Sequence, residues 1–226
     1  MSVPVHKHIR LPKDRITTLE DGIFAFSMTL LVTTIEIPSR YTSTPLPDPV
    51  AHILLKVIPD FLHYIVAFVI LAVFWYLEHQ RFLCVTWIDR KIVAMTVVTL
   101  IFVALIPFSS NLAGDYPADP LGGIVFELNV MAIGLSSFAQ WKYMRKTSDL
   151  CRPTVHEATL VREMAFALVL PVLSVLGIAL ALLKIPYSVI VYALFPVFFL
   201  LSDRIFPLSP AEEQALESGG SAIQNK

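Results

Sequence analysis

Charged residues are scarce in this sequence, since Asp, Glu, Lys and Arg together make up only 15% of its 226 residues. Hydrophobic residues reach 56%, and the mean hydropathy is +0.69. A soluble domain carries about 25% charged residues, so this composition indicates a membrane protein. The net charge is −1, which gives no sign of the basic surface that nucleic-acid binding requires. We therefore expect no nucleic-acid partner.

Residues suited to catalysis or to a structural metal site are also few. The two cysteines, Cys84 and Cys151, lie far apart in the sequence and form no CxxC motif, so we expect neither a disulfide nor a zinc site. The sequence has no HExxH motif, and the polar candidates deep in the later apolar stretches are His63, Glu127 and Asn129. We expect Glu127 and Asn129 to lie at the membrane interface. The sequence gives no catalytic residue, and we predict that the protein is not an enzyme.

Six apolar stretches are each close to the length of about 20 residues that a membrane-spanning helix needs. They predict an all-α polytopic membrane protein with transmembrane helices near residues 17–37, 57–78, 92–112, 122–143, 164–184 and 187–203. The sixth is short and contains Pro196, and Pro107 is expected to mark the end of the third helix. We predict one six-helix transmembrane domain over residues 1–206 and a polar, disordered cytoplasmic tail over residues 207–226.

The distribution of basic residues predicts the orientation of these helices. Of the 17 Lys and Arg residues, only Arg40, Lys56 and Lys184 fall in the loops on one side, and all the others fall in the termini and loops on the other. Basic loops stay on the cytoplasmic side of a membrane. We therefore expect both termini in the cytoplasm and a multi-pass protein of the cell (plasma) membrane.

The first apolar stretch differs from the others because polar residues recur along one side of it. At about 3.6 residues per turn, one narrow stripe contains Gly22, Phe26, Thr29, Thr33 and Glu36, with Leu30 and Ile37 beside it. Small residues of this kind mark contacts between membrane helices, where Thr hydroxyls bond back to the helix carbonyls. Alternatively, the stripe lines a water-filled path, which Glu36 favours because a carboxylate avoids hydrocarbon.

The second apolar stretch ends in a pair of ring-bearing residues. Trp75 and His79 are four residues apart and share one face of a helix. Spacing alone favours an interfacial aromatic residue and a headgroup histidine.

Taken together, these residues resemble the transmembrane-protein-175 family of endolysosomal potassium channels and their prokaryotic homologues. The family signature, Arg-x-x-x-Phe-Ser-Asp, is matched by Arg15 and Asp21 at the right spacing. The apolar run that follows it, and the later motifs Phe-Trp-x-x-His and Leu-x-Pro-Phe, are matched by Gly22, Phe24, Ala25, Thr29, Leu30, Leu31, Glu36, Pro38, Phe74, Trp75, His79, Pro107 and Phe108. His79 stands one residue later than its motif places it. The Phe-Ser of the signature is Leu19-Glu20 here, and Thr96 stands where an Asn is usual.

The resemblance implies a homotetramer in which the first helix of each single-repeat subunit surrounds a shared pore. The pore would be lined by Gly22, Phe26, Thr29, Leu30, Thr33 and Glu36, with an apolar constriction at Phe26 and Leu30. Selectivity would come from hydroxyl rings at Thr29 and Thr33, with transient contact between K⁺ and Thr29. Arg15, Asp21, Trp75 and His79 would form a structural network behind the pore.

The implied function is a modestly potassium-selective cation leak channel with no cofactor other than the permeant K⁺. The expected partners are the other subunits, membrane lipid and potassium ions. The sequence contains no Thr-Val-Gly-Tyr-Gly filter, so selectivity must come from rings of side chains. A secondary ion transporter or a proton-permeable membrane protein is the alternative, although a transporter is often built from paired repeats and we find no second half.

Overall fold

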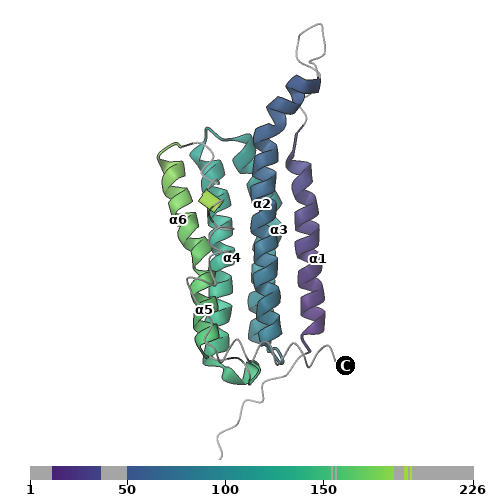
Figure 1. Ribbon diagram of the computed structural model, residues 1–226, viewed down its shortest axis with the longest axis vertical. Coiled ribbons are helices and arrows are strands. Elements are labelled where there is room, and N and C mark those ends of the chain that lie inside the picture. The colour runs from purple at the N-terminus through teal and green to yellow at the C-terminus, as the bar shows by residue number, and fades with distance from the viewer. Residues whose placement is uncertain are drawn as a thin grey trace, which may run out of the picture.

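The structure is a computed structural model that describes residues 12–36, 50–153, 155, 157–185, 191, 192 and 194. Helices run alongside one another across the molecule, from α6 at one edge to α1 at the other (Figure 1). They are α1 (Asp14–Leu30), which continues as the 3₁₀ turn η1 (Leu31–Thr34), then α2 (Val50–Cys84), α3 (Arg90–Asp115), α4 (Pro120–Lys146), α5 (Glu157–Ala167) and α6 (Val169–Leu182). A second 3₁₀ turn, η2 (Ser148–Leu150), follows α4.

The predicted all-α membrane architecture is confirmed, and the described residues contain five segments long and apolar enough to cross a membrane. Four of them are α1 with η1, α2, α3 and α4, and the fifth is Thr159–Leu182, which joins α5 and α6. The sixth predicted helix, 187–203, falls outside the described residues apart from three positions, and the predicted tail at 207–226 lies wholly outside them.

Prolines affect these helices differently from one site to the next. Pro107 was predicted to end the third helix, but α3 continues through it to Asp115, so that prediction is wrong. A proline removes one backbone donor, and in membrane helices neighbouring groups compensate for the loss. Pro59 also lies inside a helix, and the first turns of α2 bend away from the bundle (Figure 1). Pro171 follows the break between α5 and α6.

Side-chain caps fix the beginnings of α3 and α4. The Asp89 carboxylate accepts a hydrogen bond from the backbone amide of Ile92 at 2.9 Å, and Tyr143 of α4 donates to the same carboxylate at 2.5 Å. Asp119 caps α4 in the same manner, with Pro120 as the first helical residue. Caps of this kind satisfy orphan amides at a helix start, and the Tyr143 bond also ties α4 to the start of α3.

The central helices bury their apolar faces together and thereby hold α1 in place. α4 packs between α3 and α6, and α1 packs mainly on α3. One apolar core joins α1 to α4 and α6 through residues such as Phe24, Leu71, Val103 and Ile133. At the predicted cytoplasmic end, Lys13 donates to the carbonyl oxygens of Phe82 and Val85 at 2.8 and 3.2 Å. The start of α1 is therefore tied to the end of α2.

Candidate functional site

The first helix presents two opposite faces. Phe24, Ser27 and Leu31 are buried against the bundle, with at most 1% of each side chain exposed. Most of the stripe predicted from the sequence lies on the other side: Gly22, Phe26, Thr29, Thr33 and Glu36 are exposed and Leu30 is half-buried. Phe26 is 64% exposed, and Ile37 lies outside the described residues. The subunit thus packs α1 by its apolar face and turns its polar stripe outward.

The two stripe threonines have their hydroxyl hydrogens engaged by the helix. Thr29 Oγ1 donates to the carbonyl oxygen of Phe26 at 2.8 Å, and Thr33 Oγ1 donates to that of Leu30 at 2.6 Å. A hydroxyl has one donor and two acceptor lone pairs. Each threonine therefore offers the outside an oxygen that accepts and does not donate, which suits a cation.

Behind the stripe, α1 and α2 meet through three of the four residues of the predicted network. The Trp75 indole Nε1 donates to Asp21 Oδ1 at 2.8 Å, and the His79 ring stacks on the Trp75 ring with their centroids 5.7 Å apart. Arg15 is exposed on the first turn of α1 and is not part of that contact. The structure therefore brings Asp21, Trp75 and His79 together.

A buried group of charges, which the sequence reasoning missed, lies beside this contact. Glu20, Glu78 and Arg81 are exposed by no more than 3% each. Arg81 donates to Glu78 Oε1 at 2.7 Å and forms a second ion-pair contact with the other carboxylate oxygen, while Ser137 of α4 donates to Glu78 Oε1 at 2.8 Å. The Glu20 carboxyl of α1 lies near enough to Glu78 and Arg81 for both charges to act on it. Glu20 stands where the family signature has Ser, and this departure could have drawn attention to it. No sequence feature near Glu20 predicts that Glu78 and Arg81 lie beside it.

The position of Glu78 also explains the spacing of the Trp-His motif. Three residues after Trp75, where the family motif has its His, this chain has Glu78, which is buried in the bundle. His79, one residue later, is exposed and stacks on Trp75. Glu20 and Glu78 are therefore both departures from family motifs, and in the structure they face each other.

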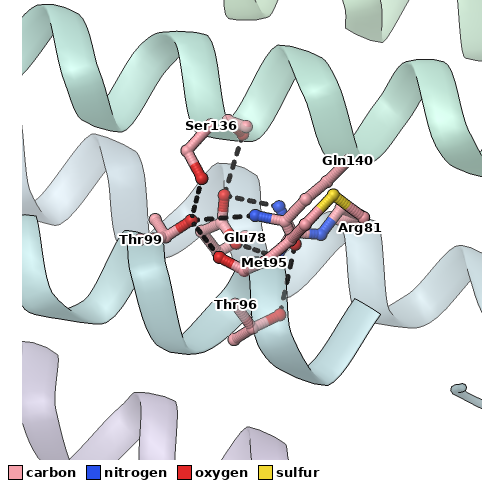
Figure 2. Close-up of polar contacts among 8 residues, drawn as sticks. Glu78, Arg81, Met95, Thr96, Thr99, Ser136 and Gln140 are labelled. Atoms are coloured by element: carbon pink, nitrogen blue, oxygen red, sulfur yellow. Dashed lines mark hydrogen bonds and ion pairs between the residues drawn. The ribbon is translucent and has the colours of Figure 1, made fainter. Parts of the chain in front are cut away.

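A separate group of uncharged, hydrogen-bonded side chains lies beside these charges, between α3 and α4 (Figure 2). Thr96 donates to Gln140 Oε1 at 3.1 Å, and Gln140 Nε2 donates to Thr99 Oγ1 at 2.9 Å. The hydroxyls of Thr99 and Ser136 are 2.7 Å apart. Thr96, noted in the sequence as a replacement for Asn, is thus fully buried and bonded. Polar side chains that satisfy one another in this way fix the register of membrane helices.

A second buried cluster corrects the placement of Glu127 and Asn129 at the membrane interface. Glu127 is completely buried and accepts a hydrogen bond from Tyr192, whose hydroxyl is 2.8 Å from that of Ser174. Asn129 is 8% exposed and donates to Ser109 at 3.1 Å. Position along the helix suggested the interface, but these side chains point towards α6 and α3. Gly177 makes room for Glu127, whose carboxyl lies directly over it.

The remaining sequence candidates show no catalytic or metal-binding arrangement within the described residues. His63 is buried in α2 and lines a pocket with Tyr116, Asp119 and Lys184 at the far end of the bundle from the start of α1. Cys84 and Cys151 are free thiols next to the Val85–Cys151 bridge, and burial raises the pKa of Cys151. No group of three or more His, Cys, Asp or Glu in the described part of the chain is arranged to hold a metal.

The described helices define an all-helical, polytopic membrane protein. Residues 15–107 match the profile described as endosomal/lysosomal potassium channel TMEM175. A potassium channel of Streptomyces collinus is 26% identical over 82% of this chain and 90% of its own length. A potassium channel of Chamaesiphon minutus is 25% identical over 84% of this chain and 94% of its own length. The crystal structure of a lysosomal potassium-selective channel TMEM175 homologue from Chamaesiphon minutus shares the fold, with a TM-score of 0.71, 23% identity and coverage of 84% of this chain and 96% of that one.

Residues 15–107, which make up less than half of the chain, are thus similar to the TMEM175 family. Members of this family are ion channels and not enzymes. The matched profile ends at Pro107, within α3. The first three helices thus carry the family's pattern.

Proposed function

We propose that this chain forms a homotetrameric, modestly potassium-selective cation leak channel in the plasma membrane, with both termini in the cytoplasm. The observation that carries the proposal is the outward stripe on α1, directly opposite the face that packs on the bundle. Hydroxyls and a carboxylate facing lipid would be costly, whereas in a water-filled path they are solvated. The curated relatives named as potassium channels support the same function.

A ring of four subunits turns the stripe into layers around one axis, because closed symmetry repeats each residue at the same height. Phe26 and Leu30 then form apolar rings that narrow the path, and Thr29 and Thr33 form hydroxyl rings whose acceptor oxygens contact K⁺ in passing. Glu36 lies just beyond η1, where the negative charges of Glu36 and Asp115 both act on Asp60 of α2. Acids gathered there raise the local concentration of cations. The contact between α1 and α2, on the side away from the pore, is made by Asp21, Trp75 and His79 and fixes the position of α1. We assign Arg15 to the same structural network.

Reconstitution of the purified protein into liposomes tests the channel and its assembly together. We expect a tetramer by light scattering in mild detergent, and fast, uncoupled potassium flux that does not saturate over physiological concentrations. The physical reason is that one α1 cannot enclose a path, whereas four can. Slow, saturable flux would identify a secondary transporter instead, and a conducting monomer would rule out the shared pore.

Replacing Thr29 tests the proposed hydroxyl ring. Thr29→Val keeps the shape of the side chain but removes the oxygen that accepts a cation contact. We expect the preference for K⁺ over Na⁺ to fall, by a factor of about 3 to 10 if the ring contributes roughly 1 kcal/mol, while conduction remains. Bilayer recordings of reversal potentials measure this preference. Thr34→Val is the matched control, because Thr34 also bonds back to its own helix but lies off the stripe, and an equal effect in both variants would refute the assignment.

A further inference from the structure

The group formed by Glu20, Glu78 and Arg81 has one carboxyl more than it has cations. Arg81 is already paired with Glu78 through two contacts, and Glu78 also accepts from Ser137. Oε1 of Glu20 has no hydrogen-bond partner among the described residues, although Glu20 is only 3% exposed. An unpaired buried charge costs several kcal/mol. The arrangement is therefore costly when all three groups are ionised.

We infer that Glu20, Glu78 and Arg81 form a proton-binding site between α1 and α2, in which the two carboxyls share one proton and its release loosens α1. With one proton bound, the group is neutral overall: one carboxylate balances the guanidinium, and the other carboxyl donates a hydrogen bond to it. Two carboxyls that share a site cannot both ionise without repulsion. This inference rests on the proposed function only in taking α1 as the pore helix.

Few charged groups lie near Glu20, so the composition of the proposed site is well defined. Within the described residues, the charged groups that act on Glu20 are Glu78 and Arg81 from α2 and its own neighbour Asp21 on α1. Ser137 of α4, which bonds to Glu78, is uncharged, and so are the nearby side chains of Thr96, Thr99 and Gln140, which bond to one another. No second cation in this group is available to balance Glu20 when it ionises, so the added negative charge must be met by water or by separation of the helices.

The position of the site connects protonation to conduction. Glu20 lies on α1 four residues before Phe24, which anchors the same face in the core, and six before Phe26 on the opposite side. Repulsion between Glu20 and Glu78 would push the start of α1 away from α2. Because opening the proposed constriction requires the first helices to move apart, conduction should rise as the site loses its proton and fall as it gains one.

Infrared spectroscopy detects the proton without depending on conduction. A protonated carboxyl has its own carbonyl absorption, which disappears on ionisation. We expect the purified protein at neutral pH to show this band, and the difference spectrum against Glu20→Gln to contain one lost protonated carboxyl per subunit. Because Glu127 is a second buried acid, Glu127→Gln serves as a control that must remove a separate component. If neither Glu20→Gln nor Glu20→Ser removes any protonated carboxyl, the site does not exist as proposed.

Flux measurements then test its effect on the channel. We expect potassium flux to rise at least about fivefold, the lower end of typical coupling between sites, when the pH on the predicted cytoplasmic side goes from acid to alkaline. Glu20→Gln should stay at the low level throughout, and Glu157→Gln, which removes an exposed acid on the same side, should respond like the unaltered protein. A pH response unchanged in Glu20→Gln would overturn the coupling. Absence of flux at every pH would refute the proposed function, and the infrared result would still decide the site.

Discussion

Replacing Phe26 with alanine is expected to raise basal potassium flux by at least about tenfold, which corresponds to about 1.4 kcal/mol removed from the barrier. Four phenyl rings that converge at one height leave little room for water, and an apolar ring closes a pore by dewetting. Phe26→Ala widens and wets this layer, and Phe26→Asn wets it with a side chain that is still branched. Liposome flux assays with potassium and with larger cations measure both effects, and both variants should conduct more.

The structure sharpens the competing explanation for Phe26. If its ring packed in the core, truncation would leave a cavity that costs about 3–5 kcal/mol. With 64% of the ring exposed on the single chain, no such cavity arises within the subunit, so each subunit should keep its thermal stability. Phe61→Ala is the matched control, because Phe61 is also well exposed, on α2. Lower stability together with lower flux in both Phe26 variants would show that the ring holds subunits together and does not gate the pore.

Removing the guanidinium of Arg81 is expected to be the most destabilising of these changes, at about 3–5 kcal/mol. In Arg81→Met, the Glu78 carboxylate stays buried and loses both contacts to its partner, and Glu20 lies beside it. Thermal unfolding of the protein in detergent, followed by tryptophan fluorescence, should show a large fall in the midpoint temperature. The double variant Glu78→Leu with Arg81→Met should recover part of the loss, because removing both members of a buried pair costs less than removing one.

Arg145 provides the control for the Arg81 prediction. It pairs with Glu157 at 2.8 Å, but the two side chains are 46% and 72% exposed. An exposed ion pair contributes about 0–1 kcal/mol. Arg145→Met should therefore leave the midpoint nearly unchanged. If the midpoint temperature falls by a similar amount in Arg81→Met and Arg145→Met, the buried pair contributes no more to stability than the exposed one.

Local sequence patterns were enough to predict much of this protein. Hydropathy predicted the described membrane helices because a span must satisfy its own backbone and present apolar side chains to lipid, and both requirements act residue by residue. The stripe on α1 followed from the helical repeat in the same way, and its exposed side matches the wheel. Pro107 shows the limit of such rules, since the sequence predicted a helix end and the helix runs on for eight residues to Asp115.

Only the tertiary structure decided which polar groups meet. Glu20 and Glu78 are 58 positions apart in the sequence, and nothing near either residue indicates that both are buried close to Arg81. The same holds for Glu127, which looked interfacial from its place along α4 but lies over Gly177 of α6 beside Tyr192. Hydropathy and periodicity report how each helix faces its surroundings. The pairing of buried charges depends on which helices become neighbours and on their register, and these are set by the packing of the whole bundle.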